Sequence, residues 1–410
     1  MKKRSVIALA CSLMLLAGCG GGEVPETSVS VTTETSTVSS SETEPSVTPE
    51  PTEVPYVYMS YEGSEEAQAI LETMTLEEKV YQMFMVSPEQ LTGTDPYEYD
   101  TVFDDNALSS IEAHPVAGVI LFGGNIVDPQ QLEAFITSYQ EASSIGLFIA
   151  VDEEGGDITR IASNPAFEVE EFSPMRLIEG EDEAYHVGNT IGTYLGVYGF
   201  NVDFAPVSDV DSNPDNTVIG DRAFSDDPYV TASMVSECVR GFHDSGMMCT
   251  LKHFPGHGDT VADTHFETAS IDRSMDEIRA CELIPFEAGI GEGADFIMAA
   301  HITTPMADAT GLPASLSHYW LTDILRYEMG YEGIIITDSM IMQAITDEFS
   351  PSDAAVAAVY AGNDIILMPE DLEMAAQGII AAVESGELPV ERIDSSVLRI
   401  LDKKIEYGLI

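Results

Sequence analysis

Eight short apolar runs, each followed by a longer segment of helical character, dominate the sequence from about residue 76 onward. Within each run the apolar residues are continuous rather than alternating, which is typical of parallel strands covered on both faces. Eight strand-helix units in one chain predict a (β/α)8 TIM-like barrel, with a doubly wound open sheet as the weaker alternative. The runs cover residues 84–86, 116–122, 147–152, 201–207, 247–253, 296–302, 333–338 and 364–369.

Proline marks the start of several of the predicted helices. Asp128 precedes Pro129, Asp227 precedes Pro228, and Pro351 opens a third helical segment. Proline suits the first helical turn because its missing N–H would have no partner there, and a preceding Asp can cap the helix. These signals support the alternation of strands and helices.

The first nineteen residues predict export. They consist of a short basic start (MKKR), an apolar run and Cys19 directly after the letters LLAG. This pattern is typical of a secretory signal peptide with a lipobox, so we expect Cys19 to be the lipidated N-terminus of the mature protein. An ordinary cleaved signal with an incidental cysteine is the alternative. The apolar run is shorter than the roughly 20 residues that favour a membrane-spanning helix.

A polar segment separates this leader from the rest of the chain. Residues 20–57 are rich in Ser, Thr, Glu and Pro and contain no Lys or Arg, so they cannot bury enough apolar surface to fold. We interpret them as a disordered tether, with residues 58–410 as one catalytic domain. The expected location is outside the cytoplasm, with the lipid anchor as the only attachment to the cell membrane.

Composition limits the possible partners. The chain has 16 Lys and Arg against 71 Asp and Glu, a formal net charge of −55. Such a surface repels nucleic acid and anionic lipid. Cys238, Cys249 and Cys281 show no paired spacing, so we expect buried thiols rather than a disulfide framework or a zinc set.

Polar residues fall at the ends of the predicted strands. Asp152, Lys252, His253, His301 and Asp338 all end an apolar run or follow it closely. In a (β/α)8 barrel, catalytic groups come from the C-terminal ends of the strands and the loops after them. We therefore expect these side chains to meet at one end of the barrel.

The segment KHFPGHGDTVADTHFE, residues 252–267, allows two kinds of chemistry. His253 and His257 are four residues apart, but the Pro and Gly residues around them argue against the helix that a metal site would use, and no HExxH pattern or cysteine pair is present. Asp263 and His265 are two residues apart, so in an extended segment they share one side. A carboxylate beside an imidazole favours acid/base catalysis, with a solvated polar loop as the alternative.

Two further groups could act with this pair. Asp338 ends the run GIIITD, where it could be a nucleophile or could cap a helix that starts in SMIMQAI. Asp152 and Glu153 end another run, and such adjacent carboxylates could instead be the acid and orienting pair of a substrate-assisted hexosaminidase.

Two arginines add to these candidate groups. Arg160 follows the DEEGG segment, and Arg222 lies in a loop rich in Asn, Asp and Gly. We count Arg222 among the candidate site residues, with a surface turn carrying a salt bridge as the alternative.

Taken together and in this order, KHFPGHGDT with DTH, DEEGGDITR, NVDFAPVSDVDSNPDNTVIGDRAF, TDSM and AGNDIILMP resemble the bacterial β-N-acetylglucosaminidases of glycoside hydrolase family 3. The resemblance extends from about residue 65 to the C-terminal end. It implies a single-domain barrel enzyme without a metal or other cofactor. Family members often have Gln where this chain has Glu153.

The resemblance also implies roles for individual residues. Asp338 matches the catalytic nucleophile, His265 the general acid/base and Asp263 its partner. The positions that hold the sugar hydroxyls and the N-acetyl group match Asp152, Arg160, Arg222, Lys252 and His253. Many family 3 β-glucosidases carry the acid/base on a second domain after the barrel. The segment after Asp338 is too short for one, so His265 in the barrel domain is the better candidate.

The expected activity is that of a retaining exo-β-N-acetylhexosaminidase. It would remove terminal β-linked N-acetylglucosamine from peptidoglycan fragments (muropeptides) or related oligosaccharides through a covalent glycosyl-enzyme intermediate. A β-N-acetylglucosaminide phosphorylase and a family 3 β-glycosidase for another sugar are the enzymatic alternatives. A solute-binding lipoprotein is the non-enzymatic alternative, because such proteins also combine a lipobox with a tether. The oligomeric state stays open.

Overall fold

The computed structural model describes residues 58–95, 98–260 and 269–410. The predicted leader with Cys19 and the predicted tether lie outside these residues, so their assignment stays a prediction. Within the described ranges, no helix combines the length and the apolar character that crossing a membrane requires.

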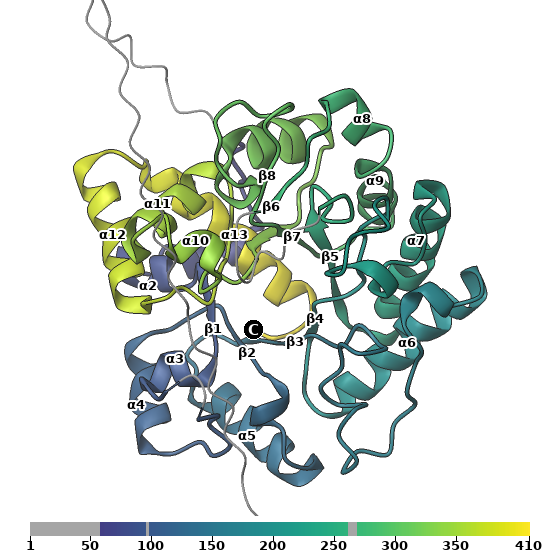
Figure 1. Cartoon of the computed structure of the whole chain (residues 1–410). Coiled ribbons are helices and arrows are strands. Elements are labelled where there is room, and N and C mark those ends of the chain that lie inside the picture. Colours follow the sequence, from purple (N-terminus) through teal and green to yellow (C-terminus); the bar gives the residue numbers. More distant parts are fainter. Residues whose placement is uncertain (1–57, 96–97, 261–268) are drawn as a thin grey trace, which may run out of the picture. The chain divides into compact units, whose positions relative to one another are not determined.

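Eight parallel strands form the centre of the domain (Figure 1). Their order in the sheet is β10-β1-β2-β3-β4-β5-β7-β9, and a parallel bridge between Ile336 and Ile365 joins the two outer strands β9 and β10. Each of the eight apolar runs overlaps one of these strands, so the predicted barrel is confirmed and the open sheet is wrong. The eight strands are β1 (Phe84–Val86), β2 (Gly118–Ile120), β3 (Phe148–Val151), β4 (Val202–Asp203), β5 (Met248–Phe254), β7 (Phe296–Ala299), β9 (Ile334–Thr337) and β10 (Ile366–Leu367).

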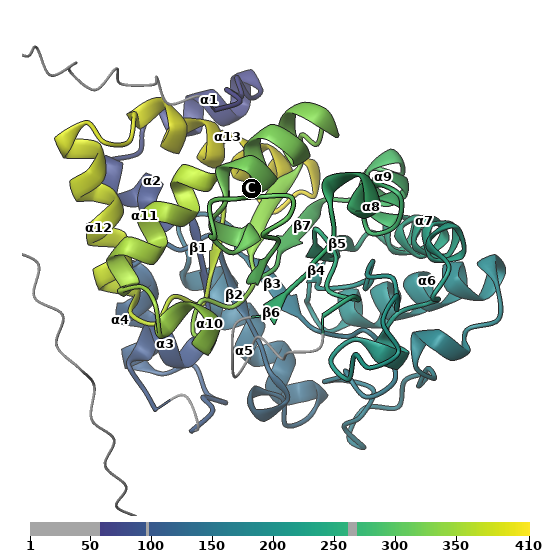
Figure 2. The same ribbon diagram turned by 45° about the horizontal axis from the view of Figure 1, so that its top comes forward.

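Helices surround these strands on the outside (Figures 1 and 2). A short parallel pair, β6 (Ala269–Ser270) and β8 (Ile302–Thr303), lies apart from the main sheet. The α-helices are α1 (Glu65–Leu71), α2 (Leu76–Tyr81), α3 (Pro88–Thr92), α4 (Asp105–Ala113), α5 (Pro129–Ala142), α6 (Glu181–Val197), α7 (Pro228–Ser245), α8 (Met275–Arg279), α9 (Leu283–Gly291), α10 (Gln343–Thr346), α11 (Pro351–Ala361), α12 (Leu372–Ser385) and α13 (Val390–Glu406). Shorter 3-10 turns cover Gly123–Asn125, Met175–Leu177, Gly220–Arg222 and Ala314–Leu316, and a helix of π type covers Tyr319–Glu328.

The proline signals mark true helix starts. Helices α5, α7 and α11 begin at Pro129, Pro228 and Pro351, and each has a capping side chain immediately before it. Asp128, for example, accepts a hydrogen bond from the backbone N–H of Gln131. The cap satisfies an N–H that has no partner within the helix.

Apolar side chains fill the interior of the barrel. Phe148 and Phe296 meet edge to face, with ring centres 5.3 Å apart, and Phe204 and Met248 belong to the same buried cluster. Ile400 of α13 completes this cluster from the N-terminal side of the strands. The interior of the barrel is therefore a packed core, as in other barrels of this type.

Helix α13 is held to the barrel by a buried carboxylate. Asp364, just before β10, is fully buried and forms ion pairs with Arg326, Arg392 and Arg399. It also accepts hydrogen bonds from Ser396 Oγ (2.6 Å) and the backbone N–H of Ile335 (3.0 Å). Burial alone would raise the pKa of Asp364, but the three guanidinium groups outweigh it and lower this pKa. The carboxylate thus connects α13, β9 and β10.

Lys404, also on α13, is buried without a carboxylate partner among the described residues. Its Nζ donates to Gln82 Oε1 at 2.8 Å and lies 5.1 Å from the centre of the Phe148 ring. Burial lowers the pKa of Lys404 to about 7. Folding therefore favours the neutral amine, whereas the unfolded chain binds the proton up to a pKa of about 10.4. Burying the charged amine of Lys404 lowers the free energy of unfolding. This cost is at its full value below pH 7 and decreases as the pH rises toward 10.

We predict that Lys404→Met stabilises the protein most at low pH. Methionine keeps the apolar stem and removes the charge, although Gln82 loses a hydrogen bond. The melting temperature of the variant relative to the parent should rise by a few degrees when the pH falls from 9 to 6. Thermal unfolding at both pH values measures this shift. Lys79→Met, which removes a partly exposed ion pair with Asp394, serves as the control and should show no such pH dependence. Equal effects of Lys404→Met at both pH values would contradict the prediction.

Candidate active site

A cavity of about 360 Å³ lies at the C-terminal ends of the barrel strands. Its apolar wall includes Phe122, Phe204, Met298, Met342 and Met368. Its polar wall contains all the residues for which the sequence predicted sugar contacts, together with the predicted nucleophile. These are Asp152, Arg160, Arg222, Lys252, His253 and Asp338, joined by Glu154 and His257.

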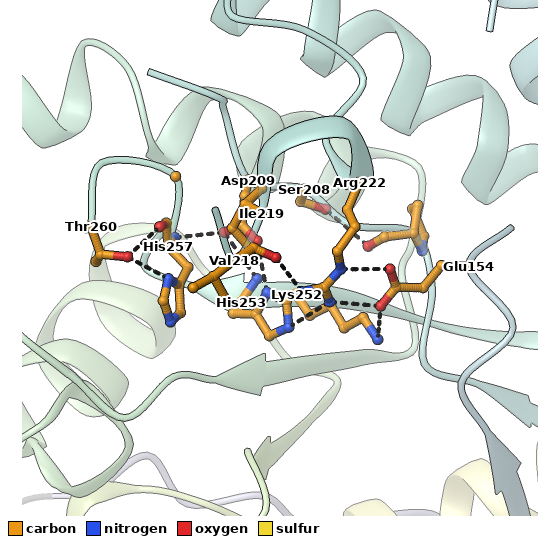
Figure 3. A network of polar contacts seen from close by, with 12 residues as sticks. Glu154, Ser208, Asp209, Val218, Ile219, Arg222, Lys252, His253, His257 and Thr260 are labelled. Atoms are coloured by element: carbon orange, nitrogen blue, oxygen red, sulfur yellow. Dashed lines mark hydrogen bonds and ion pairs between the residues drawn. The ribbon is translucent and has the colours of Figure 1, made fainter. Parts of the chain in front are cut away.

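A buried carboxylate organises the polar wall (Figure 3). Glu154 accepts two hydrogen bonds from Arg222, at 2.9 and 2.7 Å, and forms an ion pair with Lys252 Nζ at 2.6 Å. Burial alone would raise the pKa of Glu154, but Arg222 and Lys252 outweigh it and hold this pKa far below its usual range. Glu154 therefore stays ionised and fixes two cations at the cavity. Arg222 is thus part of the cavity, and its interpretation as a surface turn is wrong.

Asp152 is the second carboxylate that contacts Lys252. Its Oδ1 accepts a hydrogen bond from Lys252 Nζ at 2.8 Å, and its Oδ2 lies 3.7 Å from Arg160 NH2. Burial alone would lower the pKa of Lys252, but Asp152 and Glu154 outweigh it and raise this pKa. The ammonium group thus stays charged between two carboxylates.

Glu153, which the sequence suggested as a partner of Asp152, points away from the cavity. It is fully buried, and its two oxygens accept hydrogen bonds from the backbone N–H groups of Arg160, Ile161 and Ala162 and from Tyr194 OH. These bonds fold the loop after β3 back on itself. The interpretation of Asp152 and Glu153 as a catalytic pair therefore has no geometric support.

The segment after Lys252 turns sharply around Asp209, a buried residue of the loop after β4. Asp209 Oδ2 lies 2.7 Å from His253 Nδ1, and Asp209 Oδ1 accepts from the backbone N–H groups of His253 (3.2 Å) and His257 (2.6 Å). Burial alone would raise the pKa of Asp209, but the contacts with His253 and His257 lower it. A Cβ added at Gly258 would lie 1.6 Å from Val210 O, so only glycine fits where these two loops meet.

His257 lines the cavity as well, although the sequence suggested only a structural role in the turn. Its Nδ1 lies 2.8 Å from Thr260 Oγ1. Burial and the neighbouring His253 lower the pKa of His257. The ring is therefore neutral at neutral pH.

Asp338 follows β9 directly and reaches the cavity from the side opposite β3 in the sheet order. Its Oδ1 accepts a hydrogen bond from the Ser339 N–H at 2.7 Å. The next helix, α10, begins only at Gln343 and has no capping side chain, so the alternative role of Asp338 as a helix cap is wrong. His301, predicted at the end of β7, does not line the cavity. Its Nε2 lies 3.0 Å from Ser339 O, where it supports the backbone beside Asp338.

Asp263 and His265, the predicted acid/base pair, lie outside the described residues. The chain on each side of them is tied together. Arg273 forms ion pairs with Asp259 at 2.9 Å and with the buried Glu282 at 2.7 Å. The described ends of this segment are thus linked to each other.

One group of side chains has the composition of a metal site, at the other end of the barrel. His243, Cys249 and Asp295 place one potential ligand atom each within 4.8 Å of one another. However, Asp295 already accepts from His243 (3.1 Å), Lys403 (3.0 Å), Tyr407 OH (3.0 Å) and the Cys249 N–H (3.1 Å). A metal would have to displace these contacts. The thiols of Cys238 and Cys249 are buried, as predicted, whereas Cys281 is half-buried.

Two residues that organise the cavity, Glu154 and Asp209, were not among the residues predicted from the sequence. The sequence does contain a signal for Glu154, because this residue lies in DEEGG directly before two glycines. Both of these, Gly155 and Gly156, have positive φ, and such a turn decides which of the adjacent acids faces the cavity. Asp209 gave no comparable signal, because its partner His253 is 44 residues away.

The geometry defines a class of protein. A closed (β/α)8 barrel with ionised side chains gathered in a cavity at the C-terminal strand ends is the arrangement found in barrel enzymes.

Comparison with known proteins identifies the family. Residues 75–402 match the family model described as the glycosyl hydrolase family 3 N terminal domain, so the chain belongs to glycosyl hydrolase family 3. The chain is 35% identical over 325 residues to a protein named Beta-hexosaminidase A from Pseudoalteromonas piscicida, a match that covers 72% of this chain and 54% of that protein. A protein named Beta-hexosaminidase from Idiomarina loihiensis is 38% identical over 281 residues, covering 68% of this chain and 83% of that protein.

A solved structure supports the same assignment. The structure of a glycoside hydrolase family 3 beta-N-acetylglucosaminidase from Paenibacillus sp. strain FPU-7 superposes with a TM-score of 0.76 and 34% sequence identity. The match covers 82% of this chain and 63% of that one. The chain thus spans little more than half the length of the Pseudoalteromonas protein and less than two thirds of this structure.

We predict that the adjacent acids Glu153 and Glu154 respond differently to the same substitution. Glu154→Gln removes the charge that holds Arg222 and Lys252, so it should weaken ligand binding in the cavity by roughly tenfold or more. Glu153→Gln places an amide N–H against backbone donors and should lower the melting temperature by several degrees, with ligand affinity unchanged. Thermal unfolding and calorimetric titration with N-acetylglucosamine separate the two effects. If Glu153→Gln weakens binding as much as Glu154→Gln does, the assignment of the two acids is wrong.

Proposed function

We propose that this protein is a retaining exo-β-N-acetylhexosaminidase that removes terminal β-linked N-acetylglucosamine. The observation that carries the proposal is the position of Asp338. This carboxylate lines the same cavity as the hydrogen-bonding groups Asp152, Arg160 and Lys252. The proteins named β-hexosaminidase and the β-N-acetylglucosaminidase structure support the choice of sugar.

The proposed reaction has two steps. In the first, a carboxylate oxygen of Asp338 bonds to the anomeric carbon, the bond to the leaving oxygen breaks, and His265 donates its proton to that oxygen. In the second, His265 takes a proton from water, the water oxygen bonds to the anomeric carbon, and Asp338 leaves as a carboxylate. Asp263 would orient the His265 ring and stabilise its charged form. Asp152, Arg160, Arg222, Lys252 and His253 would hold the sugar.

The cavity supports recognition of a single terminal sugar. It is enclosed by the packed barrel interior on one side, and its volume of about 360 Å³ lies near the lower end of the usual range for small-molecule sites. A mixture of apolar wall and charged wall fits a sugar, which presents C–H groups on its faces and hydroxyl groups at its edge. A pocket with a closed base supports an exo mode of action.

We further propose that the substrate is a peptidoglycan fragment and that the protein acts outside the cytoplasm as a membrane-anchored lipoprotein. The sequence of residues 1–19 with Cys19, and the polar segment 20–57, support this location. Wall material is the N-acetylglucosamine polymer that an anchored enzyme would meet there. Labelling with a palmitate analogue, compared between the parent and Cys19→Ala, tests the anchor.

The direct test of the function is product analysis. The full chain is incubated with 4-nitrophenyl N-acetyl-β-D-glucosaminide and with a muropeptide, with and without inorganic phosphate. We expect nitrophenol and free N-acetylglucosamine in both conditions. A sugar 1-phosphate that forms only with phosphate would identify a phosphorylase, which a neutral imidazole acid/base would permit because it does not repel an anionic acceptor. Faster turnover of an aryl glycoside of a different sugar would show that N-acetylglucosamine is not the preferred sugar. Folded protein without turnover of any glycoside would support the solute-binding alternative.

Replacing Asp338 should abolish turnover without affecting the fold. Asp338→Asn keeps the shape and the hydrogen bond to Ser339 but removes the nucleophilic charge, so kcat should fall by at least roughly 10⁴-fold. Steady-state kinetics and thermal unfolding provide the measurement. Ser339→Ala, which keeps the backbone N–H, is the control and should stay active. Substantial activity of Asp338→Asn would exclude Asp338 as the nucleophile.

Replacing His265 should make the rate depend on the leaving group. Without an acid, His265→Ala should cleave substrates with poor leaving groups roughly 10²- to 10⁴-fold more slowly, while activated aryl glycosides lose far less in the first step. Rates for a series of aryl glycosides with graded phenol pKa test this. Equal slowing across the series would argue against an acid role for His265.

A further inference from the structure

Asp209 contacts the candidate site only through other residues. It is fully buried and does not line the cavity, and its side chain accepts hydrogen bonds from both the backbone and the ring of His253. His253 in turn lines the cavity with its ring and stands between Asp209 and Arg222 (Figure 3). Asp209 can therefore determine which nitrogen of the His253 ring carries the proton.

The two contacts of the ring define one tautomer. An ionised carboxylate cannot donate, so the hydrogen bond of 2.7 Å between Asp209 Oδ2 and His253 Nδ1 requires the proton on Nδ1. On the other side, Arg222 NH2 lies 3.4 Å from His253 Nε2, and a guanidinium nitrogen can only donate. Both contacts are satisfied together only when Nε2 carries a lone pair.

We propose that Asp209 is a positioning residue that keeps His253 as the neutral Nδ1–H tautomer, so that Nε2 accepts a hydrogen bond from a hydroxyl group of the bound sugar. The role of the sugar rests on the proposed function, whereas the tautomer does not. Lys252, Arg160 and Arg222 can only donate at this wall, and the Glu154 oxygens already accept from Arg222 and Lys252. The contact between Arg222 NH2 and Nε2 is long, at 3.4 Å, and Arg222 is already held by Glu154, so a sugar hydroxyl can replace it. In addition to the carboxylate of Asp152, His253 Nε2 then gives a sugar hydroxyl an acceptor that the cations cannot supply.

Asp209→Asn provides a nearly isosteric test. The asparagine oxygen can keep accepting from the two backbone N–H groups, so the turn is retained. Its amide nitrogen then faces His253 Nδ1 and donates to it, which moves the ring proton to Nε2. The Nε2–H would point at the cavity and at Arg222, and the acceptor would be lost.

The first measurement is spectroscopic and needs no activity. In protein labelled with ¹⁵N on histidine, long-range ¹H–¹⁵N correlation spectra at neutral pH should show His253 with a protonated Nδ1 and an unprotonated Nε2. Asp209→Asn should exchange the two signals. Asp211→Asn, a change in the same loop at a residue that pairs with Arg176, should leave them as in the parent. A parent spectrum with Nε2 protonated, or no change in Asp209→Asn, would overturn the proposal.

The second measurement separates control of the tautomer from a general structural role. Asp209→Asn should lower kcat/KM roughly 10- to 100-fold, the range typical for residues that orient a contacting group. In a His253→Phe background, which has no ring nitrogen, the same substitution should have no further effect. An equal loss in both backgrounds would mean that Asp209 acts only through the turn. If the parent shows the expected tautomer but no glycosidase activity, the proposed function fails and the inference about Asp209 stands.

Discussion

The ionised side chain of Glu154 is the constraint on which the cavity depends. An isolated buried carboxylate would be too costly, and so would two unpaired cations in the same place. Glu154 resolves both problems, because its oxygens satisfy Arg222 from the loop after β4 and Lys252 from β5. Three neighbouring segments of the barrel are thereby joined at one point. The cations keep their charge and their direction before any ligand arrives, which is the preorganisation that binding and catalysis require.

Preorganisation also involves polar groups that do not line the cavity themselves. Some residues at the cavity, such as His253 and Asp338, are supported by neighbours that do not line it. Asp209 supports His253, and His301 supports the backbone beside Asp338. The supporting groups are buried and hydrogen-bonded, so they specify one arrangement of the groups that line the cavity. The apolar wall opposite supplies shape without competing hydrogen bonds.

The sequence predicted the barrel well because eight continuous apolar runs leave few alternatives for a chain of this length. It also predicted which residues gather at the cavity, since the ends of parallel strands converge whatever their loops do. It failed where orientation depends on a local turn. Glu153 and Glu154 are chemically identical, and only the two glycines with positive φ after them decide that Glu154 faces the cavity. Asp338 was equally ambiguous until the start of α10 at Gln343 excluded a capping role. Roles for Asp263 and His265 stay predictions.

Helix α13 has a consequence for how the polypeptide acquires its structure. Its arginines neutralise Asp364, and Ile400 completes the apolar cluster inside the strands. Until α13 is available, the preceding segments would hold a buried acid without its full set of counter-ions and an open apolar interior. The barrel strands all come before α13 in the sequence, so they cannot reach their final stability as soon as they are synthesised. Commitment of the barrel to its native state is delayed until α13 docks, which keeps the strands loosely organised up to that point of synthesis.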